Sequence, residues 1–427
     1  MRFPTLADWL RWQEQLHPNA IDLGLDRVQR VLERMDLARP SFHVLTVGGT
    51  NGKGSCVAFL DAMLRAQDYK VGAYTSPHLL RYNERICVNG VETTDEELCA
   101  AFERVDAARG EVSLTYFEFG TLAAFDIFQG HKIDVAVLEV GMGGRLDAVN
   151  AVDPDGALVA SIGLDHQEWL GNDRDSIGYE KAGIYRKQKP AICGDRDPPA
   201  RLLKTARQLG AQLQVLGRDF DWRSSGDTWS WRGKDGEITQ LPKPALPGRI
   251  QFDNAASVLA LLQSVQSVLP VNEDALREGL RTARIHARFQ RLPGKVECVL
   301  DVAHNPAAAR VLAQNLADTP VPGKTLAVLG MFRDKAVEDV VRAMARRVDY
   351  WFLAGLGGPR GQSAAQLAGR VLSTIPGSRL TECAAVADAY RAAQAVAMPG
   401  DRIVVFGSFQ TVSAVLRIRQ ESVTNCT

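Results

Sequence analysis

The segment Val44–Ser55, VLTVGGTNGKGS, decides the fold of this chain. Its apolar start, Val44–Val47, is typical of a buried strand, a glycine-dense turn follows at once, and residues 56–67 carry apolar side chains at helical spacing. A strand, a glycine turn and a helix form a phosphate cradle, because glycines let backbone N–H groups approach an anion and the helix N-terminus adds positive potential. Lys53 can reach the outer phosphates of a nucleotide, and the Ser55 hydroxyl suits Mg²⁺.

The spacing of this turn departs from the common G-x-x-x-x-G-K-[ST] pattern. Val47 occupies the place of the first glycine, and Gly54 separates Lys53 from Ser55. A plain glycine-rich turn with a solvated lysine is therefore the alternative, and the strand before the turn and the helix after it favour the phosphate cradle.

Composition narrows the class of protein. At 427 residues with 46% hydrophobic residues, the chain is long enough for two or three domains with a large core. Lys+Arg and Asp+Glu number 50 each, so no global field favours nucleic acid or an anionic membrane. The seven cysteines, Cys426 among them, include no C-x-x-C pair, which favours free thiols in a reducing compartment. With no signal-peptide core and no membrane-length apolar run, we expect a cytoplasmic protein without nucleic-acid or membrane partners.

Apolar strands alternate with helices along the first part of the chain, which is the pattern of a parallel α/β fold. The expected strands are 44–47, 70–74, 85–88, 133–140 and 157–162, and the expected helices are 6–16, 22–35, 56–67, 94–109, 115–129, 176–185, 252–268 and 272–282. Between residues 213 and 247 three tryptophans lie among Ser, Gly and Asp, which indicates a small β insertion. Stacking on nucleic acid is the less favoured interpretation of these aromatic residues, because the basic residues beside them are few and accompanied by acids.

A second alternation of apolar strands and helices begins after the polar, basic stretch Arg284–Gly294. The expected strands are 296–301, 325–330, 350–354, 379–383 and 402–406, with helices at 307–316, 335–345, 363–372, 386–396 and after Ser408. The first of these strands lacks a G-x-G-x-x-G turn, so a dinucleotide is not expected there. We therefore predict an α/β protein: a P-loop-type, mostly parallel sheet domain with a small β insertion (1–285), a linker (286–294) and a smaller Rossmann-like domain (295–427).

Several polar residues follow apolar strands at the edge where open α/β sheets bind ligands. Ser55, Ser76, Glu139 and His166 hold such positions and together could bind Mg²⁺. Glu139 is the strongest of these candidates, because a carboxylate that ends an apolar strand is unfavourable unless it is used. Imidazole is an unusual ligand for so hard a cation. Considered alone, His166 is therefore more readily interpreted as a histidine that forms hydrogen bonds.

Four further residues could carry charge at a functional site. Lys181 lies within an expected helix and, judged alone, reads as a solvated lysine. Asp301 and His304 in DVAHNP end the first strand of the second domain, where Pro306 suits the first turn of the next helix. Arg288 can supply a cation to phosphate or to the charge that develops during transfer.

Taken together, the motifs of this chain resemble those of the Mur ligase superfamily, and within it the bifunctional dihydrofolate synthase/folylpolyglutamate synthases of bacteria. They are GTNGKGS at 49–55, SPHL at 76–79, ERI at 84–86, LTYFE at 114–118, LEVGMGGRLDAVN at 138–150, LDH at 164–166, YEKAGI at 179–184 and DVAHNP at 301–306. The resemblance implies an ATP-dependent amide ligase. Such an enzyme adds L-glutamate to 7,8-dihydropteroate, and further glutamates to the γ-carboxyl of folates, through an acyl phosphate.

The resemblance also implies the site residues. Those expected to bind ATP are Thr50, Asn51, Gly52, Lys53, Gly54, Ser55, Asn254, Arg288, Asp301 and His304. Those expected to hold two Mg²⁺ ions are Ser76, Glu139, His166 and Ser55, while Lys181 matches a lysine that carries CO₂ as a carbamate. Lys53, Lys181, His166 and Arg288 are the expected catalytic residues. Those expected to bind the pterin substrate are Gln15, Leu16, His17, Pro18, Thr115, Tyr116, Phe117, Glu118, Leu146, Asp147 and Ala148. Tyr116 or Phe117 is expected to stack on the pterin, with simple core packing as the even alternative.

Two other functions remain open at this point. A cell-wall Mur enzyme usually carries an additional N-terminal domain, whereas only about 40 residues precede the phosphate strand here. An ATP-dependent switch or kinase would not need the DVAHNP domain. We expect a monomer whose partners are small molecules: dihydropteroate, folates and L-glutamate.

Overall fold

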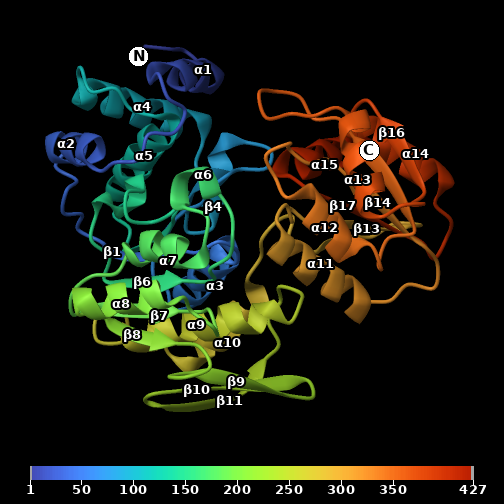
Figure 1. Ribbon diagram of the computed structural model, residues 1–427. Coiled ribbons are helices and arrows are strands. Elements are labelled where there is room, and N and C mark those ends of the chain that lie inside the picture. The colour runs from blue at the N-terminus through green and yellow to red at the C-terminus, as the bar shows by residue number, and fades with distance from the viewer. Residues whose placement is uncertain (1, 425–427) are drawn as a thin grey trace. The chain divides into compact units, whose positions relative to one another are not determined.

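The computed structural model describes residues 2–424, which form two compact units (Figure 1). The first unit comprises Met1–Ala245 with Gln251–Arg284, and the second comprises Leu246–Ile250 with Ile285–Thr427. The six cysteines within the described residues are free thiols, as predicted, and Cys426 lies outside them. Among the described residues no helix is both long and apolar enough to cross a membrane.

The first unit is built on an eight-stranded sheet with the order β4-β3-β2-β5-β1-β6-β7-β8. Its strands are β1 (His43–Gly48), β2 (Val71–Tyr74), β3 (Ile86–Val88), β4 (Val91–Glu92), β5 (Val135–Glu139), β6 (Gly156–Val159), β7 (Pro190–Cys193) and β8 (Gln212–Val215). The strands from β2 to β8 in this order pair in parallel, and only β3 and β4 join antiparallel. This confirms the predicted parallel sheet, whose central strands are apolar and buried.

Helices cover this sheet, and several of them begin at a residue whose side chain caps the helix N-terminus. They are α1 (Leu6–Leu16), α2 (Asp26–Arg34), α3 (Lys53–Ala66), α4 (Asp95–Arg109), α5 (Tyr116–His131), α6 (Gln167–Leu170), α7 (Arg174–Ala182), α8 (Ala200–Leu209), α9 (Ile250–Ser264) and α10 (Glu273–Thr282). Two short 3₁₀ helices, η1 (Tyr82–Arg85) and η2 (Ala148–Ala151), lie in the connections. Thr94 and Thr115 each begin a helix with a capping box, as their sequences indicate.

Some boundaries differ from the predicted ones. The helix expected from residue 56 starts at Lys53, because Gly52 adopts a left-handed conformation as its N-cap. The helix expected from residue 22 starts at Asp26. The strand β7 and the helix α8 were not predicted, since β7 has only four residues and follows a charged stretch.

The predicted β insertion is a three-stranded sheet of β9 (Asp221–Ser225), β10 (Thr228–Gly233) and β11 (Gly236–Pro242), in the order β11-β10-β9. Trp229 and Trp231 are buried, and their indole N–H groups donate to the carbonyl oxygens of Pro242 and Ala256. Trp222 stacks on Phe252 at 4.7 Å between ring centroids. These contacts bury Trp229 and Trp231 and half-bury Trp222, so they argue against a nucleic-acid stacking surface.

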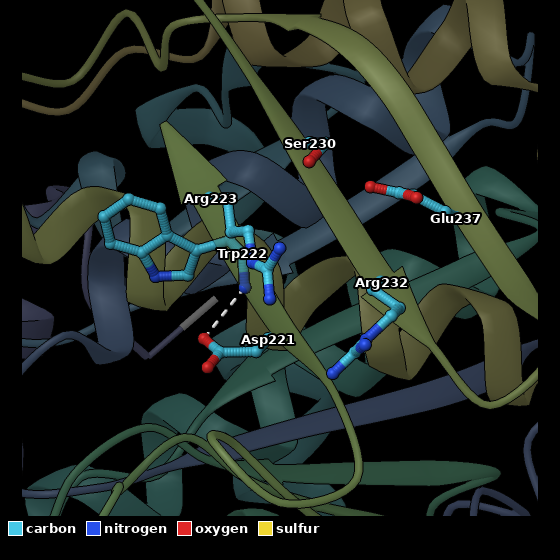
Figure 2. A pocket seen from close by; sticks show the side chains of 6 residues that line it. All are labelled: Asp221, Trp222, Arg223, Ser230, Arg232 and Glu237. Atoms are coloured by element: carbon cyan, nitrogen blue, oxygen red, sulfur yellow. Dashed lines mark hydrogen bonds between the residues drawn. The ribbon is translucent and has the colours of Figure 1, made fainter. Parts of the chain in front are cut away.

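The other face of this small sheet is polar and slightly hollowed (Figure 2). The hollow has a volume of about 100 Å³ and is lined by Asp221, Trp222, Arg223, Ser230, Arg232 and Glu237. Its charges have both signs, and Asp221 is paired with Arg196. It is a mixed, solvated face rather than a basic patch.

The second unit has a six-stranded sheet with the order β12-β13-β17-β14-β15-β16. Its elements are β12 (Gln290–Leu292), β13 (Glu297–Leu300), α11 (Pro306–Asp318), β14 (Thr325–Leu329), α12 (Val337–Met344), β15 (Tyr350–Ala354), α13 (Ala364–Thr374), β16 (Leu380–Cys383), α14 (Val386–Val396), β17 (Arg402–Phe406) and α15 (Phe409–Thr424). Five strands pair in parallel, as predicted. The sequence analysis assigned residues 286–294 to a linker, but they include β12, which pairs antiparallel with β13.

Candidate functional site

The carboxyl ends of β2, β5, β1 and β6 are neighbours at one edge of the first unit's sheet. The glycine turn between β1 and α3 lies at this edge, and two of its glycines have positive φ angles: 141° at Gly49 and 87° at Gly52. A Cβ on Gly49 would lie 3.1 Å from the backbone nitrogens of Ala160 and Ser161. The turn therefore packs closely on the connection after β6 and has no room for side chains at these positions.

Hydrogen bonds fix the turn to that same connection. The Asn51 N–H donates to Ser161 Oγ at 3.0 Å, and this hydroxyl donates to the Asn51 carbonyl at 2.9 Å. Thr50 Oγ1 donates to the carbonyl of Gly163 at 3.1 Å and accepts from its N–H at 2.9 Å. The backbone of the turn is thus held in place from outside, which preorganises a phosphate site.

Lys53 and Ser55 occupy the first turn of α3. The Lys53 ammonium donates to the carbonyl oxygens of Gly49 and Thr50, at 3.1 and 3.3 Å. Ser55 is only 2% exposed. The ammonium therefore stays over the turn, where the N-terminus of α3 adds positive potential for an anion.

Asn254, more than 200 residues along the chain, reaches the same turn from α9. Its Oδ1 atom would lie 2.7 Å from a Cβ on Gly52, and its Nδ2 donates to Gln251 Oε1 at 2.9 Å. The structure therefore brings Asn254 to the glycine turn, where the resemblance expects it to contact ATP.

Replacing Gly52 by alanine is expected to weaken nucleotide binding at least 10-fold and to lower the free energy of unfolding by about 1–2 kcal/mol, because the left-handed conformation is strained for a residue with a Cβ. The new methyl group would also meet Asn254 Oδ1. Calorimetric titration with ATP and thermal unfolding measure the two effects. The matched control is Gly130→Ala, a helical position with nothing within 4 Å of its Cβ, where stability should rise by about 0.5–1 kcal/mol. Unchanged nucleotide affinity in Gly52→Ala would contradict the role of this turn.

Two of the expected magnesium ligands lie together. Glu139 ends β5 and is 5% exposed, and its Oε2 accepts the Ser76 N–H at 3.3 Å. His166 is solvent-exposed on the connection after β6, with a φ angle of 51°. Within residues 2–424 no group of three or more His, Cys, Asp or Glu side chains gathers as a metal site. The Glu139 carboxylate and the Ser76 hydroxyl fit a hard cation such as Mg²⁺, which prefers oxygen ligands.

Lys181 is not the solvated lysine that the sequence alone favours. It lies in the last turn of α7 and is only 3% exposed. Burial, helped by the positive charge of Lys53, lowers the pKa of Lys181 to about 7, while Asp165 and Asp147 act in the opposite direction. The amine is therefore largely neutral just above pH 7, which is the form that can react with CO₂.

Asp147 and Phe117 meet at the glycine-rich connection after β5. Asp147 accepts the N–H groups of Met142 and Val149, and burial raises its pKa to about 7. The Phe117 ring packs on Gly141, where an added Cβ would lie 2.7 Å from Cζ. Two of the expected pterin-binding segments therefore converge here.

A chain of charged groups joins the third expected pterin-binding segment, residues 15–18, to residues 115–118. His17 Nε2 lies 3.4 Å from Asp22 Oδ2, and Arg27 bridges Asp22 and Glu118 at 2.9 and 3.0 Å. Glu118 also accepts the N–H of Thr115 and is nearly fully buried, so its visible role is to hold the start of α5. The sequence analysis missed Asp22 and Arg27, because Arg27 and Glu118 are 91 positions apart and nothing local pairs them.

The second unit has its own polar group at the end of β13. The Asp301 carboxylate accepts the N–H groups of Phe289 and Ala303 at 2.8 Å each, and burial raises its pKa while Arg288 and His304 lower it. His304 Nδ1 lies 2.8 Å from the carbonyl of Val302 and donates to it. Asp301, Arg288 and His304 are thus electrostatically coupled within this unit. Asn305 caps α11 and Pro306 occupies its first turn, as predicted.

Comparison with known families accounts for both units. Residues 47–262 match the model of the Mur ligase middle domain, and residues 287–409 match the Mur ligase glutamate ligase domain. The dihydrofolate synthase/folylpolyglutamate synthase of Escherichia coli K12 is 43% identical over 413 residues, which are 97% of this chain and 95% of that protein.

Solved structures of similar proteins match this chain over nearly its whole length. E. coli FolC in complex with DHPP and ADP has a TM-score of 0.93 and 42% identity, covering 98% of each chain. A bifunctional folylpolyglutamate synthase/dihydrofolate synthase with Mn, AMPPNP and L-glutamate bound has a TM-score of 0.90 and 43% identity, again over 98% of each chain. This chain therefore belongs to the Mur ligase family, in the group whose relatives are named dihydrofolate synthase/folylpolyglutamate synthase.

Proposed function

We propose that this protein is an ADP-forming ligase with both activities named for its relatives. It adds L-glutamate to 7,8-dihydropteroate, and it extends folates through their γ-carboxyl group. The observation that carries this proposal is 43% identity over 97% of the chain to a protein named for both activities. Both parts of the chain match Mur ligase models, which favours this reading over a switch or kinase. The relatives in question carry the folate-ligase name and are matched over 95–96% of their own length, which favours it over a cell-wall ligase.

The chemistry follows from the weak electrophilicity of a carboxylate. The substrate carboxylate attacks the γ-phosphorus of ATP and ADP leaves. The glutamate amine then attacks the acyl carbon of the acyl phosphate, and phosphate and a proton are lost as the amide bond forms. Lys53 and the N-terminus of α3 stabilise the charge on the transferred phosphoryl group, since such catalysis depends on positioning and electrostatics. Ser76 and Glu139, with His166 and Ser55, are proposed to hold Mg²⁺, which would offset the negative charge of the phosphate groups. The solved relative that carries Mn and AMPPNP supports a divalent cation beside the nucleotide.

Other residues are assigned on the same basis. Thr50, Asn51, Gly52, Gly54 and Asn254 are proposed to bind ATP in the first unit, and Arg288, Asp301 and His304 to contact it from the second. Lys181 is proposed to carry a carbamate, which its burial and lowered pKa support. We also propose that the protein works as a monomer in the cytoplasm, as its free thiols and neutral net charge favour.

ADP release measured against a panel of substrates tests the proposed function. Turnover should require ATP, L-glutamate and either dihydropteroate or a reduced folate, and it should not occur with UDP-sugar peptides. A switch or kinase would instead release ADP without the pair of carbon substrates. Dihydropteroate labelled with ¹⁸O in its carboxylate should transfer one ¹⁸O atom to the released phosphate. Turnover without this transfer would exclude the acyl phosphate.

Phe117→Ala is expected to raise the KM for dihydropteroate about 10- to 100-fold, because an aromatic stack and its buried area are lost. The affinity for ATP should not change, since Phe117 packs on Gly141 rather than on the glycine turn. Steady-state kinetics and calorimetric titration with AMPPNP provide these two measurements. Phe117→Tyr, which keeps the ring, is the matched control. Equal KM values in all three proteins would support simple core packing instead.

A further inference from the structure

Arg85 is a buried cation that neither the phosphate site nor the pterin-binding segments account for. It ends η1, in the ERI motif, and is 9% exposed. Its guanidinium carbon lies 5.2 Å from the ring centroid of Tyr82 and 5.5 Å from that of Tyr116. Its Nε donates to His78 Nδ1 at 2.9 Å.

No acidic side chain neutralises this guanidinium among the described residues 2–424. It contacts the rings of Tyr82 and Tyr116, the His78 imidazole and the Tyr74 phenol. The adjacent Glu84 accepts the backbone N–H groups of residues 79–81 instead. Burial raises the pKa of Tyr116 to about 12, so this phenol stays neutral and leaves the positive charge uncompensated. Contacts with aromatic faces stabilise a cation without cancelling its charge, and a buried cation is unfavourable without an anion. Arg85 therefore attracts an anion from outside the protein.

The position of Arg85 suggests which part of a substrate supplies that anion. Its imidazole partner, His78, is two residues from Ser76, whose N–H bonds to Glu139 in the proposed metal site. Its other neighbour, Tyr116, belongs to the segment proposed to bind the pterin ring. Arg85 thus contacts one residue close in sequence to the proposed metal site and one residue of the proposed pterin-binding segment.

We propose that Arg85 binds the α-carboxylate of the terminal glutamyl unit of folate substrates. This inference rests on the proposed function. Dihydropteroate has a single carboxylate, which is the group that reacts. A folate has a reacting γ-carboxylate and also an α-carboxylate that the reaction leaves unchanged. A guanidinium that pairs with this second carboxylate is a specificity-determining group for chain extension and has no partner when dihydropteroate binds.

Kinetics of Arg85→Gln with the two substrates test this assignment. We expect kcat/KM for tetrahydrofolate to fall about 10- to 100-fold, the range of one charge-assisted hydrogen-bonded pair. The value for dihydropteroate should change by less than about 3-fold, because this substrate lacks the α-carboxylate and is affected only through the lost Arg85 contact with Tyr116. Arg81→Gln is the matched control, because Arg81 is an exposed residue of the same segment that pairs with Asp95. An equal loss for both substrates, or no loss for either, would overturn the inference.

A substrate analogue supplies a second, independent test. Pteroyl-γ-aminobutyrate keeps the reacting carboxylate and lacks the α-carboxylate. The wild-type enzyme should use tetrahydropteroyl-γ-aminobutyrate about 10- to 100-fold less well than tetrahydrofolate, and Arg85→Gln should use the two about equally. Equal use of both by the wild-type enzyme overturns the inference even where Arg85→Gln does not fold. Failure of the wild-type enzyme on every folate and pteroate would instead remove the proposed function itself.

Discussion

Lys53→Ala is expected to lower kcat for glutamate-dependent ADP release by about 10³-fold or more, in the range seen when a cation that stabilises a transferring phosphoryl group is removed. The free energy of unfolding should change by less than about 1 kcal/mol, because the ammonium donates to carbonyl oxygens of its own turn and is partly exposed. Steady-state ADP release and chemical denaturation measure these two quantities. A large loss in kcat with a small change in the free energy of unfolding would indicate that Lys53 acts on a ligand rather than on the stability of the fold.

Two variants separate the charge of Lys53 from its shape. Lys53→Arg keeps the positive charge but replaces the compact ammonium with a larger, planar guanidinium. This variant should therefore retain only part of the wild-type kcat. Lys187→Ala removes an exposed lysine after α7 and should leave kcat unchanged. If Lys53→Ala turned over at a rate near that of Lys187→Ala, the glycine turn would not be the phosphoryl site.

Features that depend on neighbours in the sequence were predictable. The glycine turn could be read from residues 44–55, because the strand, the positive-φ glycines and the helix start are all local. Glu139 could be singled out because a carboxylate at the end of an apolar strand is rare, and it does lie beside Ser76. The expectation that polar residues meet at one edge of the sheet follows from the rule that ligands gather at the carboxyl ends of parallel strands.

Features that depend on distant partners were not predictable from pattern alone. Asn254 meets Gly52 across some 200 positions, and Arg27 meets Glu118 across 91. Lys181 has the same helical surroundings in sequence as a solvated lysine, and only the packing around α7 makes it buried. The strand β12 is three residues long and becomes a strand only by pairing with β13. The resemblance to a family pointed to Asn254 and Lys181, but it gave no physical reason for either position.

Lys181→Ala is expected to lower kcat about 10²- to 10³-fold, because the carbamate proposed there would hold a second Mg²⁺ or orient His166, and so help to offset the charge of the transferring phosphoryl group. In the wild-type enzyme the carbamate forms from a neutral amine and CO₂, with release of a proton. Burial lowers the pKa of Lys181 to about 7, so at fixed CO₂ pressure about nine-tenths of the amine is neutral at pH 8 and about one-tenth at pH 6. Activity should therefore fall as the pH drops through 7, and removal of CO₂ should lower it further at each pH. Mass spectrometry after trapping of the carbamate should show the addition of CO₂ at this residue.

Chemical rescue distinguishes the carbamate from a plain structural lysine. A short carboxylate such as acetate can enter the space left by Lys181→Ala and replace the missing negative charge, so it should restore part of kcat in this variant alone. Lys181→Arg keeps a permanent positive charge that cannot react with CO₂, and it should be neither active nor rescued. Lys189→Ala removes an exposed lysine that pairs with Asp155, and it should keep the full CO₂ dependence of the wild-type enzyme. Full activity of CO₂-free enzyme at pH 6, with an unmodified amine at Lys181, would rule out the carbamate and leave this lysine as a buried amine with another role.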